Sequence, residues 1–424
     1  MIEYQQQTAT AGRWLIRNGR LFDGRDGRIT GIGQSIVVDQ GVVEWIGSDG
    51  EAPAASVVID AAGGTIMPGL INSHVHLAND GAADLGAQVR SDSTATAAYR
   101  ATANALITLN AGITTVKDCG AADNVVIDLG RAVEAGIVPG PRIVAAGRVI
   151  TMTGGHGYFM GVEADGTDAV RTAVRGQLKA GAGFIKAMAT GGVLTSEVKP
   201  TQTSLLREEL AVIVQEAHHA GRRVSTHAIG REGIENAIRA GVDTIEHGFH
   251  LDASLFALAL ERGTYLVPTL AAIGNIVAQA PNGTIPPWIV DKARAEEDRS
   301  ISMFRAAVEA GVNIAAGTDA GTPFNPHDGL VDEIIAMVRI GLTPERALLS
   351  ATRDGAVNAG LQDLTGTLEL GKAADLIVVD GDPLADITAL RTIRLVAKAG
   401  TVYRDDLTGA AVGVHDGGIG GGLG

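Results

Sequence analysis

Residues 68–80, PGLINSHVHLAND, join an apolar run to two histidines and a polar segment. His74 and His76 are one residue apart, so the period-two alternation of a strand places both side chains on the same face. An apolar run of this kind, followed at once by polar residues, is typical of a buried strand in a parallel sheet. The stretch therefore predicts a first strand over Ile66–His76 with two imidazoles at its end.

Apolar runs of strand length recur along the centre of the chain, separated by stretches of helical length. The eight runs are Ile66–His76, Ile113–Gly120, Arg142–Ile150, Phe184–Gly192, Arg223–Ile229, Thr244–Gly248, Tyr265–Leu270 and Asn313–Gly321. Alternating strand and helix signals indicate a parallel sheet covered by helices, and eight units in roughly 290 residues match a closed barrel better than an open sheet. We therefore predict an α/β fold with a (β/α)8 TIM-like barrel over residues 67–366.

The two ends of the chain carry shorter strand signals separated by turn residues. In the first part these signals lie at Trp14–Ile16, Ser35–Val38, Val42–Ile46 and Val57–Ile59, and the pattern returns over 372–403. Strands with this spacing predict antiparallel sheet. We expect a small β-sandwich built from residues 1–66 and 367–407, and a flexible glycine-rich tail over 408–424.

The composition limits the partners and the location of the protein. The 424 residues include 48 acidic and 34 basic side chains, and the formal net charge of -14 repels polyanions, so no nucleic-acid partner is expected. No apolar run approaches the roughly 18 residues of a membrane span, and the first residues do not have the pattern of an export signal, so we expect neither membrane insertion nor export. Cys119 is the single cysteine, which fits a reducing, cytoplasmic location.

Polar side chains capable of chemistry end several of the predicted strands. In a (β/α)8 barrel the catalytic groups lie at the C-terminal ends of the strands. The residues in this position are His74, His76, Lys186, His227, His247 and Asp319. Each has an ordinary explanation alone: a strand-end histidine is commonly a structural residue, and Asp319 is suited to cap a helix. Together, at the same end of one barrel, they predict one shared site.

The types of these residues point to metal binding. Four imidazoles and a carboxylate without a thiolate suit zinc first, and also manganese, cobalt or nickel. A catalytic zinc typically uses about three protein ligands, so this set predicts two divalent metal ions. Two ions at about 3.5 to 4 Å need a bridging anion, which the free amine of Lys186 does not supply.

Six motifs, in order along the chain, resemble the amidohydrolase superfamily. They are PGLINSHVHL, GFIKAMATGG, VSTHAIG, TIEHG, AAGTDAG and GTLELGKAADLIVVDGDPL. The resemblance spans about residues 13 to 405 and points to the prolidase-like branch of Xaa-Pro dipeptidases, related to imidazolonepropionases and ochratoxin-type amidases. In such relatives carbon dioxide carboxylates the fourth-strand lysine, and the carbamate bridges two metals. The resemblance therefore implies a carbamate on Lys186.

The same resemblance implies a role for each remaining ligand. The implied ligands of one metal are His74, His76 and Asp319, and those of the other are His227 and His247. Two metals lower the pKa of a shared water and polarise the substrate carbonyl. Asp319 would also be catalytic, because it would accept the proton of the attacking water and pass it to the leaving amine.

Loop residues around the predicted barrel mouth are candidates for substrate contact. Relatives use a histidine after the third strand to contact the substrate carbonyl or oxyanion, and the resemblance implies this role for His156. Tyr158, which is nearby in the sequence, either contacts the substrate or is an ordinary loop residue. Ile229 replaces a tyrosine or histidine that holds the substrate carboxylate in dipeptidases, and Arg231 is either a substitute or a solvated helix-start residue. His327 either orients the substrate or caps a helix.

The sequence thus predicts a binuclear metal-dependent amidohydrolase that cleaves an amide-type C–N bond in an N-acyl amino acid or Xaa-Pro-like dipeptide. A carbamate or urea hydrolase acting on an apolar aromatic substrate is the first alternative, favoured by Ile229. An imidazolonepropionase-like cyclic amidohydrolase is another, generally with one metal and with Lys186 as a bystander. A metal-binding barrel without catalysis is the non-enzyme alternative. The expected partners are a small-molecule substrate and, by resemblance, further copies of the chain.

Overall fold

The computed structural model describes residues 12–408 and divides into two compact units. One comprises the chain up to Gly69 together with the chain from Asp363, and the other is Leu70–Gln362. The sequence alone suggested boundaries at 66/67 and 366/367. The predicted flexible tail lies outside the described residues, apart from Thr408.

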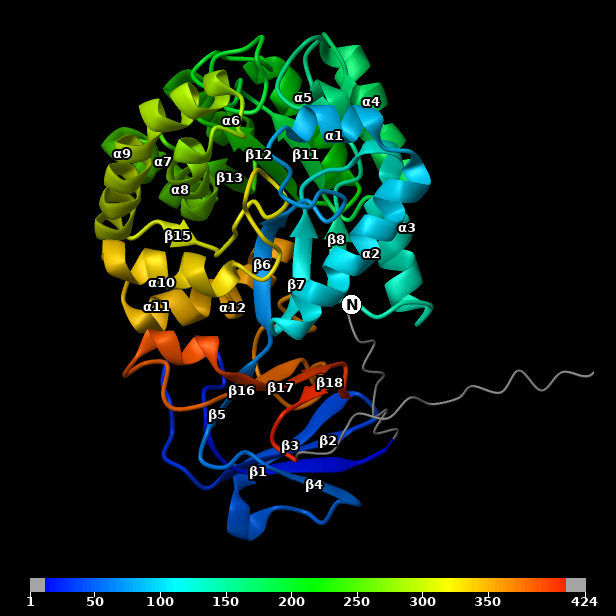
Figure 1. Ribbon diagram of the computed structural model, residues 1–424, viewed down its shortest axis with the longest axis vertical. Helices are drawn as coiled ribbons and strands as arrows, with labels where there is room; N and C mark the ends of the chain where they lie inside the picture. The colour runs from blue at the N-terminus through cyan, green and yellow to red at the C-terminus, as the bar shows by residue number, and fades with distance from the viewer. Residues whose placement is uncertain (1–11, 409–424) are drawn as a thin grey trace, which may run out of the picture. The chain divides into compact units, whose positions relative to one another are not determined.

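The first unit is a β-sheet domain built from both ends of the chain (Figure 1). Its strands are β1 (Trp14–Leu21), β2 (Gln34–Asp39), β3 (Val42–Ser48), β4 (Val57–Asp60), β5 (Thr65–Pro68), β16 (Leu376–Val379), β17 (Ile393–Lys398) and β18 (Thr401–Asp405). β1 pairs with β2 and β4 over Trp14–Gly19 and with β5 at Arg20 and Leu21, so it connects the strands of the two chain ends in one sheet. Trp14 is fully buried in the core and donates its indole N–H to the carbonyl of Gly400 (2.9 Å). The predicted small sheet domain from both chain ends is confirmed, but its sheet is mixed rather than antiparallel throughout, because β1 pairs with β4 and β5 in parallel.

The second unit contains the predicted parallel strands, but the first predicted run, Ile66–His76, is divided between β5 of the sheet domain and β6 of this unit. The strands of this unit are β6 (Leu70–Val75), β7 (Ile113–Asp118), β8 (Arg142–Ala145), β9 (Val149–Thr151), β11 (Ile185–Met188), β12 (Val224–Ala228), β13 (Thr244–His247), β14 (Tyr265–Val267) and β15 (Asn313–Ile314); β10 (Gly161–Glu163) adds to β9. β8 and β9 are two pieces of one predicted run. Each pairing among these strands is parallel, as expected from buried runs joined by helices.

Two seams close these strands into a TIM-like barrel. Gly183 donates to Ala145 (2.8 Å) at the seam between β8 and β11, and Ser73 donates to Ala316 (2.8 Å) at the seam between the end of β15 and β6. Gly317 lies at the second seam, where a Cβ atom on this residue would lie 2.9 Å from the backbone nitrogen of His74. Glycine is therefore needed for the last strand to pass β6 this closely.

Helices surround the barrel strands (Figure 1). They are α1 (Leu85–Ser91), α2 (Thr94–Asn110), α3 (Val125–Glu134), α4 (Thr167–Ala180), α5 (Arg207–His219), α6 (Arg231–Ala240), α7 (Ala253–Arg262), α8 (Leu270–Gln279), α9 (Pro287–Ala310), α10 (Leu330–Ile340), α11 (Pro344–Ser350) and α12 (Arg353–Ala359). Within residues 12–408, no helix has both the length and the apolar character of a membrane span. The fold predicted from the sequence, an α/β barrel with helices outside, is confirmed.

The barrel interior holds a polar network that the sequence did not indicate. Lys117 of β7 is fully buried and donates to Ser225 of β12 (2.8 Å) and to the side-chain oxygen of Asn358 (2.7 Å). Asn358 in turn donates to Thr244 of β13 (2.7 Å). Burial lowers the pKa of Lys117 to about 8. The network ties three strands to α12 below the ends where the predicted ligands lie.

Candidate active site

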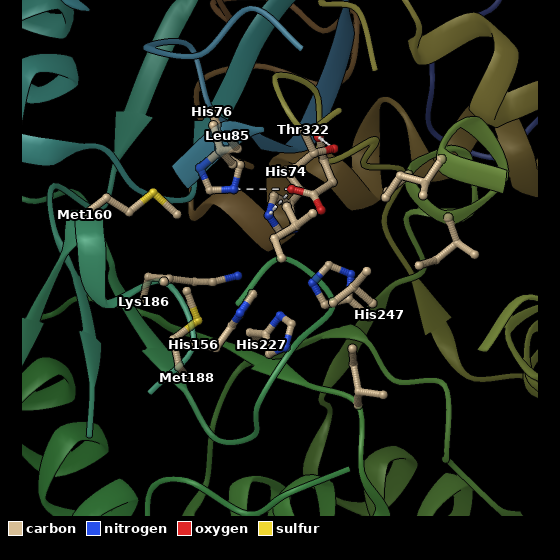
Figure 2. Close-up of a pocket in the computed structure, with 18 of the residues that line it drawn as sticks. His74, His76, Leu85, His156, Met160, Lys186, Met188, His227, His247 and Thr322 are labelled. Atoms are coloured by element: carbon tan, nitrogen blue, oxygen red, sulfur yellow. Dashed lines mark hydrogen bonds and ion pairs between the residues drawn. The ribbon is translucent and has the colours of Figure 1, made fainter. Parts of the chain in front are cut away.

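The six predicted ligands meet at one end of the barrel. His74, His76, Lys186, His227, His247 and Asp319 all line a single cavity. Figure 2 shows the imidazoles and Lys186 converging from different strands. The ring centroids of His74 and His247 are 5.3 Å apart, and those of His227 and His247 are 4.6 Å apart. Closure of the barrel thus brings together residues that are up to 245 positions apart in the sequence, from 74 to 319.

Unusual backbone conformations turn two of the predicted ligands into the cavity. His247 (φ 68°) and Asp319 (φ 62°) both adopt the left-handed region, which residues other than glycine rarely occupy. Each stands at or after a strand end, where the chain must bend away from the barrel. Such strain is found at functional sites, where surrounding contacts hold it in place. Here it serves to aim an imidazole and a carboxylate at the same centre.

His74, His76 and Asp319 form one compact group of potential ligands. One Asp319 oxygen lies 3.1 Å from Nε2 of His74 and 3.2 Å from Nε2 of His76, and the three ligand atoms lie within 4.8 Å of one another. Burial alone would raise the pKa of Asp319, but the two imidazoles hold it well below its usual range. Burial lowers the pKa of His74 to about 3. The group therefore offers an ionised carboxylate and a neutral imidazole, both in metal-binding form.

In three of the predicted ligands, His76, His227 and His247, one ring nitrogen is held by a hydrogen bond to a neighbouring group. Nδ1 of His76 donates to the carbonyl of Gly120 (2.8 Å), and Nε2 of His227 donates to that of Gly191 (2.9 Å). Nδ1 of His247 is hydrogen-bonded to the Thr269 hydroxyl (2.6 Å). Burial lowers the pKa of His227 and of His247 well below the usual value. The second nitrogen of each ring remains available to a metal, the arrangement seen around metal-binding histidines.

Lys186 has a partner that the sequence analysis missed. Glu246, immediately before His247, is fully buried, forms an ion pair with the Lys186 ammonium and lies 3.2 Å from Nδ1 of His74. Cys119 donates to its other oxygen (3.3 Å), and burial raises the pKa of this thiol to about 11. Burial also lowers the pKa of Lys186 to about 8. The sequence did contain one signal for Glu246, an acidic residue inside the four-residue buried strand TIEH.

These buried groups fit a metal centre. Beyond the ion-pair contacts, Nδ1 of His74, Nζ of Lys186 and Oε2 of Glu246 have no hydrogen-bond partner of normal geometry among the described residues. The ligand atoms of His74, Glu246 and His247 also lie within 4.8 Å of one another. Buried polar atoms without hydrogen bonds are costly, and a bound cation would satisfy them. Glu246 therefore places a further carboxylate beside the predicted ligands.

Two of the predicted substrate residues line the cavity. His156 is buried, its ring centroid lies 4.4 Å from that of His227, and its Nδ1 is hydrogen-bonded to the Thr195 hydroxyl (2.9 Å). Ile229 also lines the cavity. Tyr158 does not: the 3-10 turn Tyr158–Met160 presents Phe159 and Met160 to the cavity instead.

The other two predicted substrate residues lie elsewhere. Arg231, at the start of α6, is half exposed and pairs with Asp252 (2.7 Å) and Glu235 (2.8 Å), so its charge is neutralised outside the cavity. His327 is buried, but its Nε2 donates to the carbonyl of Asn79 (2.7 Å) and it does not line the cavity. The structure thus assigns Arg231 to the surface, as a helix-start residue, and His327 to loop packing.

Apart from the ligands and His156, the cavity is lined mainly by apolar side chains. They are Leu85, Phe159, Met160, Met188, Val193, Leu194, Ile229, Phe249, Ala272, Ile273 and Ile276. Among the described lining residues, Lys186 and Asp319 are the only charged groups other than histidines. Lys292 lies outside the lining and donates to the carbonyls of Thr195 and Val198 (2.6 Å each), which holds the loop that carries Val193 and Leu194. The cavity therefore suits an apolar group beside the polar centre.

Comparison with known proteins places this architecture in a family. The model of the amidohydrolase family matches residues 65–403. Ochratoxinase of Aspergillus niger is 29% identical over 410 residues, covering 87% of this chain and 82% of that enzyme. Imidazolonepropionase of Salinispora tropica is 27% identical over 374 residues, covering 82% and 85%.

A solved structure supports the same conclusion. The crystal structure of a Xaa-Pro dipeptidase with methionine bound in its active site is 34% identical and has a TM-score of 0.86, covering 93% of this chain and 100% of that chain. The likeness therefore extends over the barrel strands that carry the converging ligands and over the sheet domain. The chain belongs to the amidohydrolase family and is a hydrolytic enzyme that acts on C–N bonds.

Proposed function

We propose that the protein is a binuclear metal-dependent amidohydrolase that cleaves the amide bond of an N-acyl amino acid or an Xaa-Pro-like dipeptide with an apolar acyl part. The observation that carries the proposal is the convergence of four histidines, Lys186 and the ionised Asp319 at the base of an apolar cavity. The similarity of this chain to ochratoxinase and to a Xaa-Pro dipeptidase supports it, because both relatives are hydrolases.

The ligands divide between two divalent ions, for which zinc is the first candidate and manganese, cobalt and nickel the others. The proposed sets are His74, His76 and Asp319 for one ion, and His227 and His247 for the other. Lys186, as a carbamate formed with carbon dioxide, would provide the bridging anion in place of its contact with Glu246. When bound, the ions supply hydroxide at neutral pH and polarise the substrate carbonyl.

The side chains around this centre do the remaining work. Asp319 accepts the proton of the attacking water on its carboxylate and passes it to the leaving nitrogen, which keeps the electron pair of the broken C–N bond. His156 is held through Nδ1 by Thr195, so its Nε2 can donate to the substrate carbonyl oxygen as negative charge develops there. Burial lowers the pKa of His156 well below its usual value, so this donor is a neutral imidazole.

A carbamate or urea hydrolase acting on an apolar aromatic substrate is the second candidate. Ile229 lines the cavity, and Arg231, the nearby cation, is paired with carboxylates outside it. A substrate carboxylate would thus find no arginine among the described lining residues. This arrangement favours a neutral substrate over a free dipeptide.

Metal analysis and a substrate panel test the proposal together. We expect about two metal equivalents per chain and hydrolysis of N-acyl amino acids or Xaa-Pro dipeptides by enzyme loaded with zinc, manganese or cobalt. The panel also contains aryl carbamates, phenylureas and lactones, and chelator-treated enzyme is the control. One equivalent per chain would contradict the binuclear site and favour the cyclic amidohydrolase. Faster turnover of aryl carbamates or phenylureas would favour the second candidate.

His156→Ala is expected to lower kcat about a hundredfold, because one donor to the developing oxyanion is lost. Thr195→Val is the matched control, since it keeps the imidazole and removes only the hydroxyl that orients it. We expect a smaller loss of kcat in this variant, with metal content unchanged in both. Steady-state kinetics on the best panel substrate measure the effect, and an unchanged kcat in His156→Ala would remove His156 from the mechanism.

We further propose that the enzyme acts in the cytoplasm on a small-molecule substrate, without a nucleic-acid or membrane partner, and as a homo-oligomer. The net charge of -14 and the single cysteine support the first part. Sedimentation velocity at micromolar concentration tests the last part, and a monomer over the whole concentration range would contradict it.

A further inference from the structure

Helix α8 forms one wall of the cavity. Ala272, Ile273 and Ile276 of this helix line the cavity. The residue before the helix, Thr269, is hydrogen-bonded to Nδ1 of His247 (2.6 Å). The start of α8 therefore bears both on the apolar wall and on the orientation of a proposed metal ligand.

The start of α8 lacks a cap from its own segment. Thr269 lies in the left-handed region (φ 50°), and its side chain makes no capping hydrogen bond. The carboxylate of Glu333, in α10, accepts instead from the backbone N–H of Leu270 (2.8 Å) and of Ala271 (2.7 Å), one on each oxygen. A carboxylate at this end also interacts favourably with the helix dipole. One side chain from another helix thus holds the first turn of the wall.

Glu333 occupies this position at a cost. Its side chain is fully buried, and burial raises its pKa from 4.5 to about 7. The negative charge of Asp319 raises the pKa of Glu333 further. Helices α9 and α11 also pack against α10, but among the described residues Asp319 is the charged side chain that affects this pKa. Between pH 4.5 and about 7 the folded chain holds this proton and the unfolded chain does not, so raising the pH favours unfolding. Despite this destabilising effect, Glu333 holds the start of α8 through its two backbone hydrogen bonds.

We propose that Glu333 is a positioning residue that determines substrate specificity by fixing the α8 wall and, through Thr269, the ring of His247. Glu333 touches neither the cavity nor a proposed ligand, and it acts through the two backbone bonds that it accepts. The proposal rests on the proposed function only for the identity of the cavity as the substrate site.

Hydrogen–deuterium exchange of the full-length, metal-loaded enzyme tests the anchoring directly. In Glu333→Gln the amide keeps one acceptor oxygen and turns a donor toward the other N–H. We expect the protection of the first turn of α8 to fall about tenfold, the effect of roughly one lost hydrogen bond to a charged group. Unchanged protection of α8 in this variant would overturn the proposal.

Glu209→Gln is the matched control. Glu209 is also buried and accepts from two backbone N–H groups at helix starts, those of Gly166 and Leu206 (2.7 Å each), but it does not line the cavity. We expect this variant to leave the protection of α8 as in the wild type. Loss of α8 protection in Glu209→Gln as well would show a general effect of removing a buried carboxylate and would overturn the specific role of Glu333.

Specificity gives a second readout that a purely structural residue would not change. We expect Glu333→Gln to raise KM about tenfold for a substrate with a bulky apolar acyl group, and much less for its acetyl analogue. An equal change for both substrates, or none, would contradict the specificity role. If no panel substrate is hydrolysed, the proposed function fails while hydrogen–deuterium exchange still decides the role of Glu333.

Two further experiments cover the case in which Glu333→Gln does not fold and the effect of pH on the free energy of unfolding. Glu333→Asp keeps the charge but is one methylene too short to reach both N–H groups, so α8 protection should also fall, and unchanged protection would overturn the proposal. The difference in unfolding free energy between the wild type and Glu333→Gln isolates Glu333 from the buried histidines, which both proteins share. This difference should shift against the wild type as the pH rises from 5 to 7, whereas the pH dependence of Glu209→Gln should match that of the wild type. A difference between the wild type and Glu333→Gln that does not change with pH would contradict the raised pKa of buried Glu333.

Discussion

Asp319→Asn is expected to lower kcat/KM by about two to four orders of magnitude while most of the metal stays bound. The asparagine keeps the size of the side chain and one carbonyl oxygen beside His74 and His76. It cannot accept the proton of the attacking water or deliver it to the leaving amine. Steady-state kinetics and elemental analysis of the same preparation measure the two effects separately.

A surface aspartate supplies the control for this variant. Asp252 caps α7 by accepting from the backbone N–H groups of Ser254 and Leu255, and it does not line the cavity. Asparagine caps helices about as well as aspartate, so Asp252→Asn should retain full activity and both metals. If Asp319→Asn turned over substrate as fast as the wild type, Asp319 could not be the proton carrier.

Lys186→Ala is expected to abolish detectable hydrolysis and to reduce the metal content below two equivalents, because the bridging ligand is lost. The variant should also destabilise the metal-free chain, because there it leaves the fully buried Glu246 without the Lys186 ammonium. A short carboxylic acid or bicarbonate supplied in solution should restore part of the activity by entering the space of the missing side chain. Full activity in the variant would exclude the bridging role.

The other buried lysine of the barrel provides the matched comparison. Lys117 donates to Ser225 and Asn358 and does not line the cavity. Lys117→Met should therefore lower the temperature of thermal unfolding yet retain both metals. Loss of metal in both variants would show that removal of any barrel lysine disrupts the site, and the special role of Lys186 would not stand.

Much of the architecture follows from local pattern. The eight apolar runs predict the barrel because a strand buried on both faces needs consecutive apolar residues, and helices between them need turns of their own. The convergence of the six predicted ligands follows from the barrel, since parallel strands end on the same side. His74 and Lys186 could thus be placed at one centre without any knowledge of their contacts.

Contacts between distant segments were beyond local pattern. Glu246 was missed because its neighbours Lys186 and Cys119 come from other strands, and the letters TIEH do not say which strand faces the glutamate. Arg231 appeared close to the cavity along the chain, but Asp252 and Glu235 hold it outside. The position of the Arg231 side chain thus depends on carboxylates that lie beside it only in the folded chain.

The sequence by itself determined the class of fold, the end of the barrel that carries the chemistry and the residues that meet there, because burial and strand periodicity are local properties. Only the tertiary structure decided which side chains hold those residues, including Glu246 beside Lys186 and Glu333 at the start of α8. It also decided that Phe159 and Met160, rather than Tyr158, line the cavity. These outcomes depend on barrel closure and on backbone turns such as that at Asp319, which contacts far along the chain impose.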